Sequence, residues 1–274
     1  MVEFTPFTIL AHLKSLLETG EYSDLTITCG DDTYHVHKLL VCSQSSFFKK
    51  AEKFPVGKEA AEAKIDLPED EPAVVKLLIQ FLYEGEYEPK LPDSEYRKAD
   101  GSYTVTAPKV SRFHYQFPHT CRRGCPAPDY DVCPHHSCKH DTCKEKCENF
   151  ICAVCTAPPP PDGGAAQLLL HAQLYESGDK YDIPALKHLA REKFDRAAKS
   201  FWNADEFSHA VEHACLTTPE SDFGLRDIII NTISAHIELL NKPSIIQLLK
   251  TQTGLAYGVL LRRSRDMGWI KNVD

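Results

Sequence analysis

The N-terminal third of the chain alternates between helical and strand-like spacing of apolar residues. Residues 7–19 carry an apolar stripe at intervals of three and four, which predicts a helix that ends at Gly20. Apolar and polar residues then alternate over 25–29, which predicts a strand. A second strand is expected over 33–37, and the acidic pair at 31–32 predicts the turn of a hairpin between them.

Three more elements follow before this pattern stops. Residues 38–52 have the spacing of a helix, and residues 64–67 have that of a short strand. Residues 68–87 open with proline and acidic residues, which suit a helix N-terminus, and the helix is expected to end near Gly85. The core candidates of the first of these helices are Leu39, Leu40, Phe47 and Phe48.

Periodicity is lost after residue 90 and returns near residue 165. Prolines and cysteines recur over 91–164, a segment that closes with the linker-like run "APPPPDGG". A stretch this long without periodicity predicts an insertion. Beyond it, 165–200 has the pattern of two helices, the second with Pro184 in its first turn, and 201–274 has that of three more. Suitable N-caps for the later helices are Ser221 or Asp222, and Ser244.

Three segments together resemble the BTB/POZ domain family. They are "YSDLTITCGDDTYHVHKLLVCSQSSFFKKA" (22–51), "KEAAEAKIDLPEDEPAVVKLLIQFLYEGEY" (58–87) and "HAQLYESGDKYDIPALKHLAREKF" (171–194). The combination is specific, whereas a single His-Lys pair would carry little weight. The positions that carry the resemblance are Asp24, Leu25, His37, Lys38, Leu40, Ser45, Phe48, Tyr175, Asp179, Lys180, Tyr181 and Leu186.

The resemblance implies an α+β fold, in which a cluster of helices is capped by a small sheet and followed by an all-helical extension. We expect a BTB/POZ domain formed by 1–90 and 165–200, split by a Cys- and Pro-rich insertion at 91–164, with the extension at 201–274. Within that extension, residues 217–240 resemble the helical tail of many fungal BTB proteins.

The resemblance also implies a surface for self-association. BTB homodimers commonly bury the N-terminal helix in a symmetric contact, which here implies Leu10, Leu13 and Leu17. They also place a charged pocket near the two-fold axis, which implies Asp24 and Lys38. The alternatives are that the helix folds back on its own domain, and that Asp24 only caps or pairs locally.

A second implied partner is a cullin-type ubiquitin ligase. Family members contact it through an apolar-x-Glu motif before the third strand, and the aligned residues are Gly57, Lys58 and Glu59. Glu59 is therefore the candidate contact. The apolar anchor is replaced by glycine, which weakens the adaptor hypothesis because such anchors carry much of an interface's energy.

Eight of the 11 cysteines lie between residues 121 and 155, in pairs separated by three, four, three and two residues. Two tetrahedral zinc ions need eight ligands, so this set is numerically sufficient for structural zinc. The alternatives are a disordered loop whose thiols bind metal adventitiously, and a redox or disulfide role. The candidate ligands are Cys121, Cys125, Cys133, Cys138, Cys143, Cys147, Cys152 and Cys155, with His135, His136 and His140 as substitutes.

Charge and composition limit the classes of function that the sequence favours. A formal net charge of −8 argues against a nucleic-acid binder, which needs basic surface to displace counterions. No run approaches the roughly 20 apolar residues that span a bilayer, and the N-terminus has no basic leader, so we expect a protein of the cytoplasm or nucleus. No glycine-rich phosphate loop precedes a helix, and no triad pattern surrounds His37, so we expect no enzyme.

The sequence therefore predicts a protein-protein interaction module. It is expected to form a homodimer and to recruit partners as a scaffold or a cullin ubiquitin-ligase adaptor. The alternative is a zinc- or thiol-dependent regulator, including a transcriptional regulator, that acts through the insertion.

Overall fold

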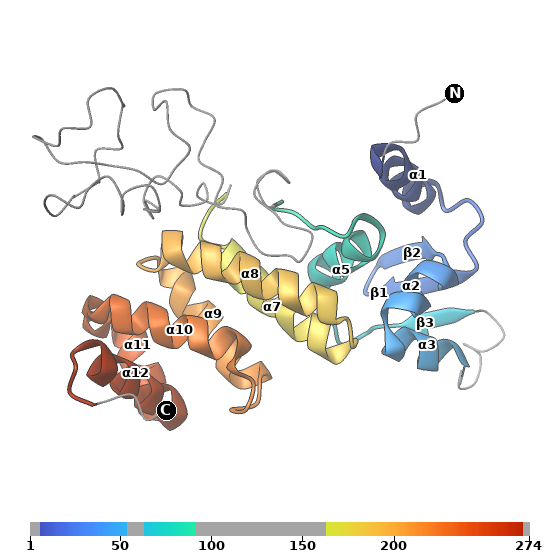
Figure 1. The fold of residues 1–274 in the computed structure, drawn as a ribbon. Coiled ribbons are helices and arrows are strands. Elements are labelled where there is room, and N and C mark those ends of the chain that lie inside the picture. Colours follow the sequence, from blue (N-terminus) through green and yellow to red (C-terminus); the bar gives the residue numbers. More distant parts are fainter. Residues whose placement is uncertain (1–5, 54–62, 91–162, 271–274) are drawn as a thin grey trace, which may run out of the picture. The chain divides into compact units, whose positions relative to one another are not determined.

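A small sheet lies in the N-terminal part of the chain (Figure 1). The computed structural model describes residues 6–53, 63–90 and 163–270. Strand β1 (Leu25–Cys29) pairs antiparallel with β2 (Asp32–Val36) and parallel with β3 (Lys64–Asp66), so the strand order is β2-β1-β3. The predicted hairpin is confirmed, but its turn comes one residue earlier, at Gly30 and Asp31. Gly30 has a φ of 54°, which suits a residue without a Cβ.

Helices α1 (Pro6–Thr19) and α5 (Pro72–Glu84) end where the sequence predicts. Gly20 and Gly85 follow them with positive φ of 67° and 66°, and the Gly85 N–H donates to the Phe81 carbonyl, as in a glycine C-cap. Helix α5 is the main core helix of this part. Its buried side chains are Val74, Val75, Leu78, Ile79, Phe81, Leu82 and Tyr83.

The single helix expected over 38–52 is two helices, α2 (Lys38–Gln44) and α3 (Ser46–Lys53). Ser45 separates them with an extended backbone, φ −132° and ψ 121°. Its hydroxyl donates to the Tyr181 carbonyl at 2.6 Å and accepts from the Phe48 N–H at 3.1 Å. A serine side chain that bonds backbone groups competes with helix continuation, which apolar periodicity does not show.

The core prediction for this pair of helices was right for Phe48 and wrong for Leu39. Phe48 is fully buried, whereas Leu39 is 80% exposed. The break at Ser45 turns α3 relative to α2, so one helical wheel drawn over both segments does not describe which side chains face inward.

Helices α7 (Gln167–Lys180) and α8 (Pro184–Phe201) form a tightly packed pair (Figure 1). Pro184 occupies the first turn of α8, as predicted. At the corner between them the backbones approach so closely that a Cβ on Gly178 would lie 2.7 Å from the Lys187 nitrogen. The Tyr181 ring in this corner stacks on Phe48 of α3, with ring centroids 5.2 Å apart. Residues far apart in the sequence therefore share one core.

The remaining helices are α9 (Asp205–Thr217), α10 (Phe223–Ala235), α11 (Pro243–Thr251) and α12 (Thr253–Asp266), with a 3-10 helix η3 (Ile237–Asn241) after α10. Two of the three helices expected over 201–274 are therefore each divided, one into α10 and η3 and the other into α11 and α12. The helix expected after residue 243 breaks at Gln252, where two flanking threonines and a glycine lower helix propensity. Its N-cap is Lys242 rather than Ser244, with Pro243 at the first helical position.

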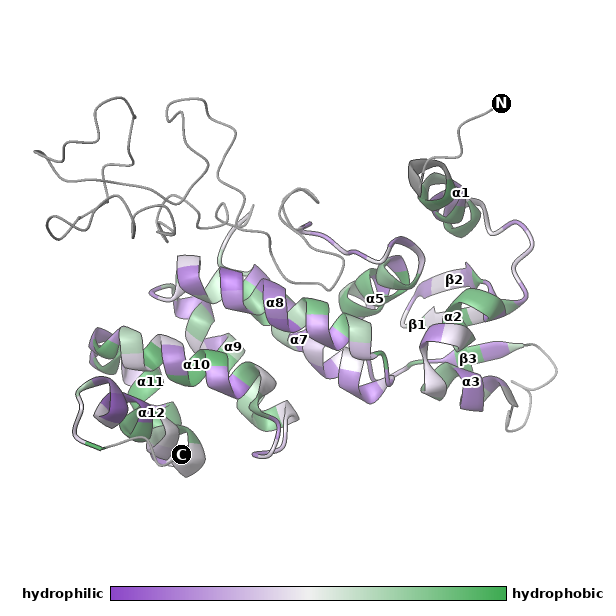
Figure 2. Cartoon of the chain, in the orientation of Figure 1, coloured by the Kyte–Doolittle hydropathy of each residue, from purple (hydrophilic) through white to green (hydrophobic). Residues whose placement is uncertain are grey.

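The α+β fold with a helical extension is confirmed by this arrangement. Apolar and polar residues share most helices, which are green and purple along their length in Figure 2. Among the helices of the described residues, none combines the length and the hydropathy needed to cross a bilayer.

Asp222 joins the extension to the helices α7 and α8. Its Oδ1 accepts hydrogen bonds from the Tyr175 hydroxyl at 2.6 Å and the Gly224 N–H at 2.9 Å, so it is the N-cap of α10, one of the two predicted. Its Oδ2 lies 2.7 Å from Lys187 Nζ. Burial raises the pKa of Asp222, but the hydrogen bonds from Lys187, Tyr175 and Gly224 outweigh it and hold the pKa below its ordinary value.

A carboxyl whose folded-state pKa is lowered stabilises the fold above its unfolded-state pKa of about 3.9 and loses that contribution as the pH falls further. We expect Asp222→Asn, which keeps an N-cap acceptor but removes the charge, to cost about 1–2 kcal/mol at neutral pH and little in strong acid. Urea unfolding across the acid range measures this. A cost that does not shrink as pH falls would contradict the charge-based account.

Candidate interaction surface

Helix α1 presents apolar side chains to solvent. Ile9 and Leu10 are 56% and 47% exposed, whereas Leu13 and Leu17, further along the same stripe, are half-buried. The helix contacts α5 and β2 of its own chain. It therefore folds back on its own domain, one of the two alternatives, and still leaves the start of its stripe uncovered.

Asp24 and Lys38 meet, but through the Lys38 backbone. Asp24 Oδ1 accepts from the Lys38 N–H at 2.7 Å, at the start of α2, whose own N-cap residue, His37, makes no side-chain cap bond. The Lys38 ammonium lies 3.2 Å from Glu52 Oε1 of α3, and both side chains are one-third exposed. Asp24 therefore caps α2 locally. A role for the two residues in a dimer pocket stays a prediction.

His37 is held by hydrogen bonds on both ring nitrogens. Its Nε2 lies 2.8 Å from the Glu21 carbonyl, which can only accept, so Nε2 carries the proton. Its Nδ1 lies 2.7 Å from the Tyr83 hydroxyl, which also accepts from the His37 N–H at 2.9 Å. Burial raises the pKa of Tyr83 to about 12, so this hydroxyl stays protonated and donates to Nδ1. The prediction of a satisfied, partly buried histidine is confirmed.

The segment that follows α5, from Glu86 to Pro89, is held by a buried lysine on α8. Lys193, 2% exposed, lies 2.5 Å from Glu86 Oε1 and donates to the carbonyls of Tyr87 and Pro89 at 2.5 and 2.7 Å. The Tyr87 hydroxyl is 3.0 Å from Nδ1 of His171. Burial and the nearby Lys193 charge lower the pKa of His171 to about 3, so it is neutral at physiological pH.

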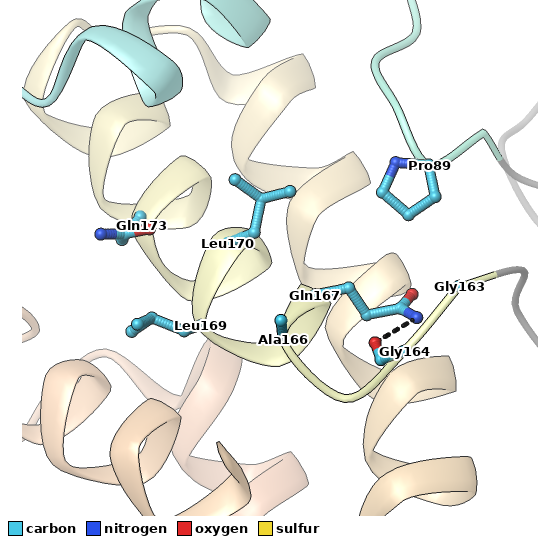
Figure 3. Close-up of a pocket in the computed structure, with 8 residues that line it drawn as sticks. All are labelled: Pro89, Gly163, Gly164, Ala166, Gln167, Leu169, Leu170 and Gln173. Carbon is cyan, nitrogen blue, oxygen red and sulfur yellow. Dashed lines mark hydrogen bonds between the residues drawn. The ribbon is translucent and has the colours of Figure 1, made fainter.

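A shallow pocket lies beside this anchor, where the chain leaves at Pro89 and returns at Gly163 (Figure 3). Its wall carries apolar groups and two glutamine amides, one of which, Gln167 Nε2, donates to the Gly164 carbonyl at 2.9 Å. The described residues that line it offer no acid, base or thiol for catalysis. They are Pro89, Gly163, Gly164, Ala166, Gln167, Leu169, Leu170 and Gln173.

Two groups of predicted residues lie outside the described ranges. One is the cullin motif at 57–59, including Glu59, and the other is the set of candidate zinc ligands between 121 and 155. Structural zinc therefore stays a prediction. Within the described ranges, no cluster of three or more His, Cys, Asp or Glu side chains is arranged to hold a metal ion. The thiols described there are free, and they belong to Cys29, Cys42 and Cys215.

Sequence reasoning did not identify Lys193 as a buried residue. A signal was present, because Lys193 follows Leu186 by seven residues and Leu189 by four. That spacing puts it on the buried face of α8. Asp70 was missed as well. It accepts from the Tyr181 hydroxyl at 2.6 Å and from Lys180 Nζ at 2.8 Å. Both donors are more than 100 residues away in the sequence, so no local pattern predicts these contacts.

Comparisons with known proteins agree with this geometry. The BTB/POZ domain model matches residues 13–106, which include the sheet, α2, α3 and α5. The chain is 36% identical over 73 residues to BTB/POZ and MATH domain-containing protein 5 of Arabidopsis thaliana, and 31% identical over 71 residues to protein 3 of the same series. These alignments cover 27% and 26% of this chain and 17% of each relative, so this chain spans about a sixth of their length. Residues 13–106 of this chain are a BTB/POZ domain, a member of a family of protein-interaction domains.

Proposed function

We propose that this BTB/POZ protein forms a homodimer through α1 and uses the dimer to bring recruited proteins together. The observation that carries the proposal is the exposure of Ile9 and Leu10 on an amphipathic helix that already packs on its own domain. A two-fold contact would place this stripe against its own copy, which satisfies the symmetry of an isologous interface.

The energetics favour such a contact. Complete burial of a leucine or isoleucine side chain contributes about 1.5–3 kcal/mol. The stripe begins with two such residues that solvent reaches, and it continues into Leu13 and Leu17, which are only half-buried. A partner helix would cover all four positions at once, so the gain accumulates along the stripe.

We expect Leu10→Asp to shift the protein from dimer to monomer. It places an uncompensated carboxylate within the apolar contact, where a buried charge without a partner costs several kcal/mol, on the order of 3–5. Sedimentation equilibrium over a range of concentrations measures the change in the dimer dissociation constant.

Ala11→Asp is the matched control, because Ala11 is the next residue on the same helix, is exposed and points away from the stripe. It introduces the same charge and should leave the dimer intact. Equal loss of dimer in the two variants, or a wild-type protein that is monomeric at every concentration tested, would contradict the proposal.

We also propose that 165–200 complete the BTB/POZ domain, although the family match ends at residue 106. The Tyr181 corner supports this. The Tyr181 carbonyl accepts from the Ser45 hydroxyl, its ring stacks on Phe48, and its own hydroxyl donates to Asp70. These three partners all lie within the family match. Expression of residues 13–106 alone should yield a poorly folded protein, and a cooperative native-like melt would oppose the proposal.

A role as scaffold or cullin adaptor extends the same proposal. It rests on Glu59, which stands in the aligned cullin motif, and it is weakened by Gly57, which supplies no apolar anchor. The test is co-purification with a cullin from cells that express the full chain. If Glu59→Ala leaves the recovered cullin unchanged, the motif-based contact is wrong.

A further inference from the structure

Two histidines of helix α9 lie about one helical turn apart. Residues 209–213 read "HAVEH", so His209 and His213 are four positions apart and share one side of the helix. His209 is exposed, and His213 is half-buried where α9 packs on α7. Pairs of histidines at this spacing on a helix bind zinc in metalloenzymes, because both imidazoles can reach one ion.

A carboxylate of α7 holds the second of these histidines. Glu176 Oε2 lies 3.0 Å from His213 Nε2, and the two side chains are 39% and 23% exposed. Glu176 thereby engages one ring nitrogen and leaves the other, Nδ1, for a metal ion. A histidine that binds a metal usually has its second ring nitrogen against a carboxylate or carbonyl, which fixes the ring and raises its basicity. The contact with Glu176 has this arrangement.

The charge on α9 favours a cation. The helix contains no lysine or arginine, and its acidic residues are Asp205, Glu206 and Glu212. Glu206 precedes His209 by three positions and is exposed like it, so a carboxylate lies within one turn of the histidine pair. Imidazole nitrogen suits zinc and its neighbours among the transition metals, whereas calcium and magnesium prefer oxygen ligands.

We propose that His209 and His213 bind a zinc ion, with Glu176 as the positioning residue of His213. The two imidazoles are the protein ligands, and water fills the remaining positions. This agrees with the absence, among the described residues, of a cluster of three or more metal-binding side chains. Structural zinc sites have four protein ligands, so an ion held by two exchanges with the solution. The site uses neither the cysteines between 121 and 155 nor the α1 stripe.

Isothermal titration calorimetry of the full-length, reduced protein tests this proposal. The protein is first exposed to excess zinc and passed through a gel-filtration column, so that any thiol sites of higher affinity are filled before the titration. Zinc should then bind to one further site. His209→Gln should abolish this binding, and Glu176→Gln should weaken it by about tenfold or more, as removal of an orienting carboxylate does in other metal sites.

His188→Gln is the matched control, because His188 is an exposed histidine of α8 with no histidine four positions away. It makes the same chemical change and should leave the titration as in the wild type. Without zinc, both histidine variants should keep the wild-type melting temperature, since each side chain is exposed. The proposal is overturned by a wild-type protein that binds no further zinc, by unchanged affinity in His209→Gln or Glu176→Gln, or by an equal loss in His188→Gln.

Discussion

Replacement of Lys193 by methionine is expected to lower the free energy of unfolding by about 3–5 kcal/mol, the range found when one member of a buried ion pair is removed. Methionine keeps most of the aliphatic volume, so packing changes little. The substitution removes the cation that lies 2.5 Å from Glu86 and 3.6 Å from the centroid of the Tyr87 ring. It also removes the donor to the carbonyls of Tyr87 and Pro89. Glu86 is left largely buried with its charge uncompensated.

Urea unfolding followed by circular dichroism measures this effect. The control is Lys199→Met on the same helix, where the lysine side chain is 71% exposed and pairs with Asp195 four residues earlier. Such exposed pairs contribute little, so the control should cost less than about 0.5 kcal/mol. Similar losses in the two variants would show that Lys193 acts as an ordinary surface charge.

Gly178→Ala is expected to destabilise the protein by about 1–3 kcal/mol, although alanine is the better helix former. A methyl group at this position would lie 2.7 Å from the Lys187 nitrogen and 2.9 Å from its Cα. Those atoms belong to the backbone of α8 and cannot rotate away as the end of a side chain can. Helix α7 must therefore move away from α8, and the contacts of the Tyr181 corner are strained with it.

Gly164→Ala separates this steric effect from any general effect of removing a glycine. A Cβ at Gly164 meets no atom within 4 Å, so this variant should be neutral or slightly stabilising. Thermal unfolding of both variants provides the comparison. Retention of full stability by Gly178→Ala would mean that the close approach of the two helices is relieved at no cost.

The helices and strands were predictable wherever apolar periodicity alone sets them. The ends of α1 and α5 follow from Gly20 and Gly85, and the strand β1 follows from simple alternation. Periodicity failed at Ser45 and at Gln252. A side-chain hydrogen bond from Ser45 to a residue 136 positions away divides one helix, and weak helix formers around Gln252 divide the other. A long-range hydrogen bond cannot be read from a local pattern.

For the candidate interaction surface, too, local features were predictable from the sequence and tertiary ones were not. The stripe with Leu10, Leu13 and Leu17 was visible in the sequence, because one face of a helix is a local property. How much of that stripe its own domain covers depends on tertiary packing. Asp24 shows the same limit, since a carboxylate that caps a helix 14 residues later has no signature beyond its residue type.

The anchoring of Glu86 to Pro89 by Lys193 has a consequence for the evolution of the chain. Pro89 and Gly163 line one pocket, so the fold itself brings together the two points between which residues 90–162 run. The entropy needed to close a flexible loop grows only with the logarithm of its length, at about 0.6 kcal/mol for each doubling. Segments of very different length can therefore occupy this place at similar cost. This position can therefore accept inserted sequence while the surrounding fold is retained.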